Sequence, residues 1–493
     1  MTDDAAADPA AAIEFGTDGW RATLETFTDE RVRWVAQGVA TTLRERATVD
    51  DDGGGATGDE DTDAEYDPGT VAVGYDAREH SRGFAEQISR VLAANGHDAL
   101  LSETDLPTPI TAWTVTDRDL AGALVVTASH NPPEYNGVKF LPSDGTPALP
   151  PVTDAIEANL AEPTALPETE WGTVEEEDLV TPYLDHAVAF VPASLDGRRI
   201  AYDAMHGSGR GVTDDLLARA GADVDRLRCE SDPEFGGGSP EPEPERVTEL
   251  VERVTEGGAH LGVVNDGDAD RIGVVTPARG YLDPNLFFAA IYDYLLDGGG
   301  DAGNVGDVGD VVRTVSTSSI VDRVAAAHEQ TVHETAVGFK WVAAAMGDHD
   351  ALMGGEESGG FGVRGHLRNK DGVLLALLAA AADAEEALDD RVDRLLDEHG
   401  EIHQGRVSVD CPDDRKQAVL DELDGKLPNE VAGSTVANVS TVDGFKIALE
   451  DGGWLLVRPS GTEPKMRIYG EGESEERVDE LLAAGRDVVE PLV

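Results

Sequence analysis

The sequence predicts an α/β fold, with three similar α/β domains that contain mixed sheets and a C-terminal α+β domain. Short apolar runs alternate with amphipathic segments through about 400 residues, in three successive rounds, which is typical of strands alternating with helices. Beyond about Gly400 the segments become strand-rich. At 493 residues the chain is also too long to fold around one core. We therefore expect roughly three to five domains.

The first round begins with a helix for which Thr28 is a suitable N-cap, because apolar residues recur at helical spacing from Val32 to Leu43. An acidic, glycine-rich stretch at about residues 48–69 then lacks any apolar periodicity. We interpret this stretch as a solvated surface insertion, with a functional tail as the alternative.

The remaining elements follow from apolar periodicity. We expect first-round strands at residues 71–75, 99–101 and 122–126, with a helix at about 84–92 that ends at Gly96. Second-round strands are expected at 199–203, 224–227 and 261–264, with helices ending at Gly221 and at about 247–254. The third round predicts helices at 286–296, 320–327 and 340–346 and strands at 311–315 and 331–334. The last domain predicts strands at 406–409, 445–449 and 454–457 and helices near 417–423 and 475–484.

The charge of the chain is extreme, with 98 Asp and Glu against 38 Lys and Arg and a formal net charge of −60. Binding to nucleic acid needs a basic surface, so this partner is excluded. Self-repulsion of this size is screened at about 1 M salt, which indicates a protein of a salt-in halophile. The two cysteines, the acidic start of the chain and the lack of a long apolar run predict a cytoplasmic protein outside the membrane.

The serine loop, residues 127–133, places a hydroxyl on a rigid turn. Ser129 follows the apolar run 122–126, and Pro132 with Pro133 prevents a helix from starting at once. His130 is adjacent, and Lys139 follows an Asn-Gly pair that we expect to form a turn back toward the hydroxyl. This arrangement suits a serine that carries a group covalently, although a polar loop after a buried strand is the simpler alternative.

The aspartate loop, residues 265–271, brings three carboxylates together between two apolar strands. Asp266, Asp268 and Asp270 stand at alternate positions, where they can converge on one hard cation. Arg271 and Pro277 occupy positions where a calcium loop requires Gly and Glu, so an EF-hand is excluded. Oxygen ligands with room for water and phosphate favour Mg²⁺, and a solvated acidic turn is the alternative.

Three further segments carry polar groups on turns. In the glutamate loop, residues 354–360, paired carboxylates and a hydroxyl could bind sugar hydroxyls, and in the arginine turn, residues 458–464, an arginine and two hydroxyls could hold a phosphate. A scarce lysine follows Gly338 at an expected helix start, where it could bind an anion. Ordinary structural turns remain the alternative for each. The chain has no P-loop and no Rossmann glycine fingerprint, which disfavours kinase and dehydrogenase chemistry.

These motifs together resemble the α-D-phosphohexomutase superfamily of phosphoglucomutases and phosphomannomutases, here a haloarchaeal member. The sequence Gly-Thr-Asp-Gly-Trp-Arg at 16–21, the serine loop, the aspartate loop, the glutamate loop and the arginine turn follow in family order over nearly the whole chain. The resemblance implies a heart-shaped molecule whose four domains each contribute a loop to a central cleft. The expected domains are a phosphoserine domain (1–165), a metal-binding domain (166–276), a sugar-recognition domain (277–400) and a phosphate-binding α+β domain (401–493).

The resemblance also implies a mechanism for the interconversion of hexose 1-phosphate and hexose 6-phosphate. Ser129 would be phosphorylated, and its phosphate would bind Mg²⁺ together with Asp266, Asp268 and Asp270. A hexose 1,6-bisphosphate would be the intermediate and the priming activator. His130 and Lys139 would transfer protons. The implied substrate-binding residues are Arg21, Arg271, Gly338, Lys340, Glu356, Ser358, Arg458, Ser460, Gly461 and Thr462.

The expected sugar is glucose, because the sequence Gly-Glu-Glu-Ser-Gly resembles the phosphoglucomutase branch. Family members that act on mannose or glucosamine usually carry Met or Gln at the position of Glu357 and His at that of Gly360. Phosphomannomutase and phosphoglucosamine mutase activities are therefore alternatives. A Mg²⁺-dependent sugar phosphatase and a non-catalytic sugar-phosphate-binding protein are less favoured. We expect sugar phosphates as the only partners and a monomer or small homo-oligomer.

Overall fold

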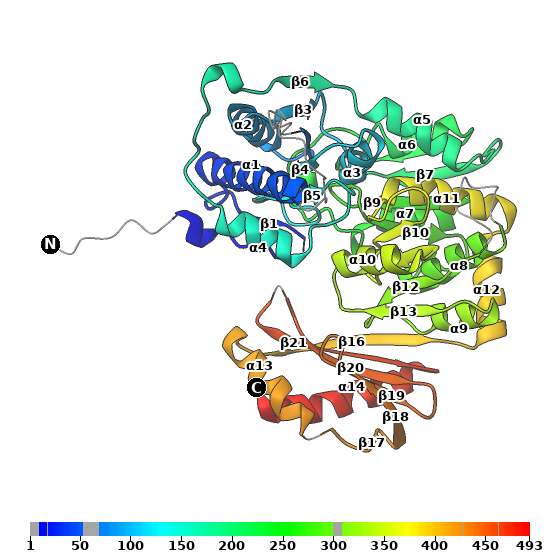
Figure 1. Ribbon diagram of the computed structural model, residues 1–493. Helices are drawn as coiled ribbons and strands as arrows, with labels where there is room; N and C mark the ends of the chain where they lie inside the picture. The colour runs from blue at the N-terminus through cyan, green and yellow to red at the C-terminus, as the bar shows by residue number, and fades with distance from the viewer. Residues whose placement is uncertain (1–8, 17, 53–68, 299–307, 426, 462) are drawn as a thin grey trace. The chain divides into compact units, whose positions relative to one another are not determined.

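The computed structural model describes residues 9–16, 18–52, 69–298, 308–425, 427–461 and 463–493. These residues form four sheets. Each of the first three contains both parallel and antiparallel strand pairs, and the last is antiparallel (Figure 1). The fold class expected from the sequence is confirmed. The chain divides into two compact units: one holds the described residues up to Tyr281 together with Gly365–Ala381, and the other holds the remainder. None of the helices in the described part is long and apolar enough to cross a membrane.

The first sheet has the strand order β1-β5-β4-β2-β3-β6. Its central parallel strands are buried on both faces because helices cover them, which explains why they are apolar runs rather than alternating patterns. The strands are β1 (Trp20–Thr23), β2 (Thr70–Tyr75), β3 (Asp98–Ser102), β4 (Gly122–Val126), β5 (Tyr135–Pro142) and β6 (Val174–Glu177). The helices are α1 (Asp29–Asp52), α2 (Ser81–Ala94), α3 (Thr108–Asp117) and α4 (Pro150–Ala158), with 3₁₀ turns at Pro9–Ala12 and Glu168–Glu170.

Two features of this sheet differ from the sequence-based expectations. Helix α1 continues to Asp52, into the stretch expected to be an acidic insertion, most of which lies outside the described residues. Strand β6 pairs with β3 although it lies beyond the boundary placed at residue 165. The three domain boundaries stay predictions.

The second sheet has the order β11-β10-β9-β7-β8 and positions the aspartate loop in the hairpin between β9 and β10. Its strands are β7 (Arg199–Asp203), β8 (Asp223–Leu227), β9 (Leu261–Asn265), β10 (Ile272–Thr276) and β11 (Gly280–Tyr281). Its helices are α5 (Val180–Phe190), α6 (Thr213–Arg219) and α7 (Thr248–Thr255), with 3₁₀ turns at Phe235–Gly237 and Pro244–Arg246.

The third sheet has the order β13-β12-β14-β15. Its strands are β12 (Val311–Thr314), β13 (Val332–Thr335), β14 (Met353–Gly355) and β15 (Phe361–Val363). The helices in this part of the chain are α8 (Pro284–Leu296), α9 (Ile320–Ala327), α10 (Phe339–His349), α11 (Gly372–Glu385) and α12 (Leu388–His399). Helix α11 is apolar all round, and its residues 373–380 are buried. The segment Gly365–Ala381 belongs to the first unit, although it was expected in the third domain.

The C-terminal sheet has the order β16-β21-β20-β19-β18-β17, and all its pairs are antiparallel. Figure 1 shows it in orange to red, with α14 packed against β16, β20 and β21. The strands are β16 (His403–Asp410), β17 (Glu430–Val431), β18 (Ser434–Ser440), β19 (Phe445–Leu449), β20 (Trp454–Pro459) and β21 (Lys465–Gly472). The helices are α13 (Asp413–Asp424) and α14 (Glu475–Val489), followed by a 3₁₀ turn at Glu490–Leu492.

Candidate active site

Ser129 lies directly after β4 with its backbone in the left-handed region, at φ 52°. This conformation is unfavourable for a residue other than glycine and needs support from its surroundings. The Ser129 amide donates to Thr127 Oγ1 at 2.8 Å. The Ser129 hydroxyl is buried and donates to Asp266 Oδ2 at 2.7 Å. The structure therefore joins the serine loop to the aspartate loop through the predicted nucleophile itself.

The aspartate loop presents three buried carboxylates whose ligand atoms lie within 4.8 Å of one another. Each of them has a partner: Thr108 Oγ1 donates to Asp268 Oδ2 at 2.6 Å, the Arg271 amide donates to Asp266 Oδ1 at 3.1 Å, and Lys139 Nζ donates to Asp270 Oδ2 at 2.8 Å. Asp268 Oδ1 and Asp270 Oδ1 are buried without a hydrogen-bond partner among the described residues. Orphaned carboxylate oxygens in a buried cluster fit a hard divalent cation.

The two loops approach so closely that only glycine fits at residue 267. A Cβ atom on Gly267 would lie 2.5 Å from the Ser129 carbonyl oxygen, a backbone atom that cannot move aside. Gly267 is therefore required for the contact between the serine loop and the aspartate loop.

Lys139 reaches the carboxylates from strand β5. Its Nζ lies 3.0 Å from Asp268 Oδ2, 2.8 Å from Asp270 Oδ2 and 3.0 Å from Asp18 Oδ2. The expected turn at Asn136-Gly137 is wrong, because both residues lie inside β5, which pairs with β4 on one side and with β1 on the other. Lys139 therefore reaches the site along a strand register, opposite Val125.

Lys370 is a second buried lysine in the cluster, and the sequence analysis missed it. Its Nζ lies 3.2 Å from Asp18 Oδ2 and 2.9 Å from Asp270 Oδ2. Asn369 fixes this segment by donating to the Gly145 carbonyl at 2.9 Å. Lysine is scarce in this chain, and Lys370 stands in a short polar run before the fully apolar start of α11. That combination is the signal that could have identified it.

The lysines and carboxylates shift one another's pKa values. Burial alone would lower the pKa of Lys139, but Asp18, Asp268 and Asp270 outweigh burial and raise it well above its usual value. Burial would raise the pKa of Asp18, but Lys139, Lys370 and Arg21 hold it well below its usual range. Burial, followed by repulsion from Asp268 and Asp270, raises the pKa of Asp266. A cation bound to these carboxylates would oppose the shift at Asp266.

The other predicted residues of the first unit surround this cluster. His130 Nδ1 lies 3.4 Å from Ser129 Oγ, and Arg271, burial and Arg21 lower the pKa of His130, so the ring is neutral. Arg21 donates to Asn131 Oδ1 at 3.2 Å and lies 3.3 Å from Asp18 Oδ2. Arg271 Nη1 lies 3.7 Å from Glu241 Oε1.

The glutamate loop lies in the second unit, between β14 and β15. Glu356 is buried and accepts a hydrogen bond from the Gly338 amide at 2.9 Å, just before α10 begins. Gly338 has φ 119°, which favours glycine there. Lys340 Nζ lies 5.8 Å from the Trp341 ring centre, and Ser358 is exposed. Glu356 therefore joins the glutamate loop to the segment that contains Gly338 and Lys340.

The arginine turn is anchored by residues that the sequence analysis did not identify. Arg458 Nε donates to Asp443 Oδ2 at 2.8 Å, and the same oxygen accepts from the Val337 amide at 3.2 Å. Lys416 Nζ donates to the Ser460 carbonyl at 2.6 Å. Asp443 therefore links the arginine turn to the segment that contains Gly338. Gly461 is exposed, and Thr462 lies outside the described residues.

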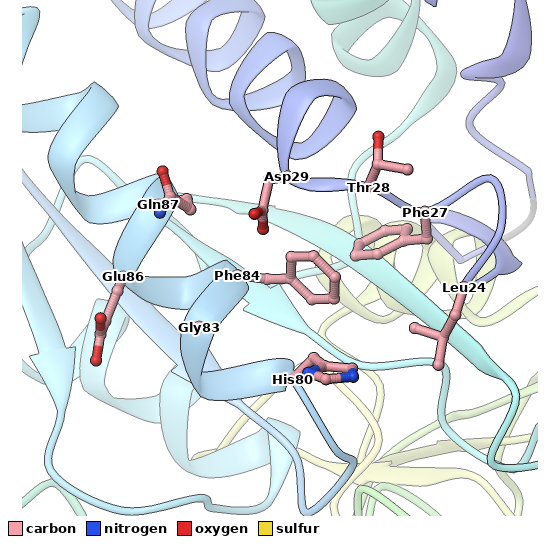
Figure 2. Close-up of a pocket in the computed structure, with 9 residues that line it drawn as sticks. All are labelled: Leu24, Phe27, Thr28, Asp29, His80, Gly83, Phe84, Glu86 and Gln87. Carbon is pink, nitrogen blue, oxygen red and sulfur yellow. The ribbon is translucent and has the colours of Figure 1, made fainter.

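A cavity of about 460 Å³ lies elsewhere in the first unit. Figure 2 shows it between the start of α1 and α2, with Phe84 facing Phe27 and with His80 beside them. No predicted site residue lines this cavity. A second void, of about 10 Å³, is lined by residues that include Asp18 and Lys139, so it belongs to the carboxylate cluster.

Four family models for phosphoglucomutase/phosphomannomutase match the chain. They are alpha/beta/alpha domain I at residues 59–166, domain II at 181–280, domain III at 283–399 and the C-terminal domain at 407–488. The chain is 30% identical over 428 residues to a phosphoglucomutase/phosphomannomutase of Thermococcus kodakarensis, covering 85% of this chain and 90% of that protein. It is 33% identical over 421 residues to a phosphoglucosamine mutase of a Synechococcus species, covering 83% and 85%.

A solved structure from Thermus thermophilus, described as a candidate phosphomannomutase, extends the similarity to the fold. It is 30% identical, has a TM-score of 0.79 and covers 97% of this chain and 99% of that chain. The matched models together span most of the chain, in the order of the domains. The chain therefore belongs to the phosphoglucomutase/phosphomannomutase family of mutases, which are isomerases of carbohydrate metabolism.

Proposed function

We propose that the protein interconverts hexose 1-phosphate and hexose 6-phosphate, with glucose as the preferred sugar, through a phosphorylated Ser129 and a hexose 1,6-bisphosphate. One observation carries this proposal: the Ser129 hydroxyl donates to Asp266 at 2.7 Å inside a buried cluster of carboxylates and lysines. A hydroxyl in that position is suited to carry a phosphoryl group beside a cation.

The charges of the cluster support a phosphorylated serine with a divalent cation. Carboxylates and cations are interleaved in this set. Its members are Asp18, Asp266, Asp268 and Asp270 with Arg21, Lys139, Arg271 and Lys370, and Glu241 lies 3.7 Å from Arg271. A phosphoserine adds about two negative charges, which one divalent cation offsets. A phosphoserine without the cation, or the cation without a phosphoserine, would leave uncompensated charge in a buried site.

Asp266, Asp268 and Asp270 would hold the cation, for which we propose Mg²⁺ because all three ligands are carboxylate oxygens. Bound Mg²⁺ neutralises charge on the phosphoryl oxygens. Asp268 Oδ1 and Asp270 Oδ1 have no hydrogen-bond partner among the described residues, and they are the oxygens available to bind this ion.

The chain's own residues divide the proton transfers between them. The sugar hydroxyl attacks the phosphorus, the bond from phosphorus to Ser129 Oγ breaks, and the hydroxyl proton needs an acceptor. His130 is the proposed acceptor, because it is neutral and its Nδ1 lies 3.4 Å from Ser129 Oγ, and the negative charge of a phosphoryl group on Ser129 would raise its lowered pKa. Lys139 stays protonated because its pKa is raised, so it serves first as a fixed positive charge; it would act as the proposed acid only after bound Mg²⁺ offsets the carboxylates that raise its pKa. Arg21 and Arg271 add positive charge near the transferred group.

The glutamate loop and the arginine turn carry groups suited to bind other parts of the substrate. Arg458, Ser460, Gly461 and Thr462 would bind the phosphate that does not react. Glu356 and Ser358 would bind sugar hydroxyls, with Gly338 and Lys340 beside them. Glu356 accepts a hydrogen bond from the Gly338 amide at 2.9 Å, which places its carboxylate in the glutamate loop beside the start of α10.

The net charge of −60 supports a protein that works in molar KCl, in the cytoplasm, without nucleic acid or membrane partners. We keep a monomer or small homo-oligomer as the proposed state. Among other functions, phosphomannomutase and phosphoglucosamine mutase activities have the most support, because relatives of this chain carry those names.

A coupled assay in molar KCl with Mg²⁺ tests the proposal. Glucose, mannose and glucosamine 1-phosphates are compared, each with a catalytic amount of the matching bisphosphate, and inorganic phosphate is measured in parallel. We expect turnover that is fastest with glucose, almost no phosphate release, and no turnover by S129A. Continuous phosphate release would favour a phosphatase, and turnover by S129A would contradict the serine assignment.

A further inference from the structure

The serine loop is held by Arg78, a buried arginine between β2 and α2. The residue is 4% exposed. Its Nη2 donates to the carbonyl oxygens of Ser129 at 2.7 Å and Asn131 at 2.6 Å. Its Nη1 donates to the carbonyl oxygens of Pro132 at 2.7 Å and Tyr135 at 3.2 Å. Three carbonyl groups of the serine loop, and that of Tyr135 at the start of β5, therefore converge on a single guanidinium.

The fifth N–H of Arg78 fixes the direction of the guanidinium plane. Nε donates to Asp76 Oδ2 at 2.9 Å, so all five N–H groups have acceptors. The ring of Phe235 lies 4.9 Å from the guanidinium carbon and covers its face. A lysine could not reproduce this arrangement, because an ammonium group has three donors and no plane.

Asp76 connects Arg78 to the other side of Ser129. Its Oδ2 also accepts from Thr127 Oγ1 at 2.7 Å, and Thr127 Oγ1 accepts from the Ser129 amide at 2.8 Å. The amide of Ser129 is thus held through Thr127 and its carbonyl through Arg78. Both peptide groups that flank Ser129 are restrained by the same ion pair.

These restraints matter because Ser129 has an unfavourable backbone conformation and points at a carboxylate. The left-handed φ of 52° persists only where the surroundings enforce it. A phosphoryl group on Ser129 would repel Asp266, so a loosely held loop would turn away from the carboxylates. Phosphoryl transfer needs the phosphorus in line with the attacking oxygen, and a displacement of about 1 Å can cost about 100-fold in rate.

We propose that Arg78, together with Asp76 and Thr127, is a positioning residue that holds Ser129 in its left-handed conformation, so that the phosphorylated serine stays aligned for transfer. This inference rests on the proposed function. Arg78 contacts the backbone of the loop and not the hydroxyl that reacts, so it acts through Ser129.

The test compares R78K and T127V with wild type and with R82K. Arg82 is a matched control because it lies in α2 and makes several hydrogen bonds, to Tyr75, Glu103 and Glu176, but none to the serine loop. Mutase kcat and KM, the extent of Ser129 phosphorylation by hexose 1,6-bisphosphate, and thermal unfolding are measured in molar KCl.

We expect R78K and T127V to lower kcat by about 100-fold and to slow Ser129 phosphorylation, while KM stays within about threefold of wild type. R82K should retain wild-type kinetics. A folded R78K or T127V with kcat within about threefold of wild type overturns the proposal. If R78K does not fold, T127V decides the question, because it removes the other half of the restraint. If neither variant folds, these residues have a structural role, and that result also overturns the proposal. Inactive wild-type protein would instead refute the proposed function.

Discussion

Replacing Lys370 by methionine removes one of the two ammonium groups that lie between Asp18 and Asp270. Lys370 Nζ is 3.2 Å from the Asp18 carboxylate and 2.9 Å from that of Asp270, and its side chain is only 6% exposed. Methionine retains the apolar length of the lysine stem, so the substitution mainly removes charge. Asp270 is left with Lys139, and Asp18 is left with Lys139 and with Arg21 at 3.3 Å.

The expected loss follows from burial and from the partner that remains. Removing one member of a buried ion pair costs about 3–5 kcal/mol, because the other charge stays buried without compensation. Lys139 remains 3.0 Å from Asp18 and 2.8 Å from Asp270, which places the cost at the lower end, about 3 kcal/mol. Asp270 is also a proposed Mg²⁺ ligand, so Mg²⁺ would replace part of the lost positive charge there and should stabilise K370M more than wild type.

Chemical denaturation in molar KCl, with and without Mg²⁺, measures both effects. K465M is the control, because Lys465 pairs with Glu463 at 2.9 Å but its side chain is 34% exposed, so its loss should cost less than about 1 kcal/mol. A K370M protein that is as stable as K465M, or that gains no more from Mg²⁺ than wild type does, would refute the reasoning about the cluster.

Three further predictions concern the cation, acid stability and salt. D268N should weaken Mg²⁺ binding by at least about 10-fold in a calorimetric titration, and unchanged affinity would count against the site. Burial would raise the pKa of Glu334, but Lys446 and Arg313 lower it from 4.5 to about 2. Glu334 therefore adds stability above pH 4.5 that is lost as the pH falls toward 2, and E334Q should show a flatter acid-unfolding curve; equal curves would contradict this. The unfolding midpoint of wild type should rise with KCl, and a constant midpoint would contradict the role assigned to the charge of −60.

The sequence predicted the elements whose apolar pattern is local. The helix Ile320–Ala327 and the strand Phe445–Leu449 were predicted at their observed bounds, because their buried residues recur at the period of the element itself. The turn predicted at Asn136-Gly137 was wrong for the opposite reason. Its local preference is for a turn, but pairing with strands on both sides makes it part of β5.

The candidate site was predictable where its residues stand together in one motif. Asp266, Asp268 and Asp270 occupy one hairpin, so their convergence on a point follows from spacing alone. Lys370 bonds to Asp18 across 352 residues; its scarcity and its polar surroundings could mark Lys370 as a candidate, but they do not indicate Asp18 as its partner. Arg78 was missed because its acceptors are backbone carbonyls, which every residue has.

Mass mapping of the protein after incubation with hexose 1,6-bisphosphate and Mg²⁺ in molar KCl tests the central claim most directly. The account predicts that one phosphoryl group is added at Ser129, and that hexose monophosphate removes it again with formation of the bisphosphate. A phosphoryl group on another residue, or its release as inorganic phosphate before transfer to the sugar, would contradict the account.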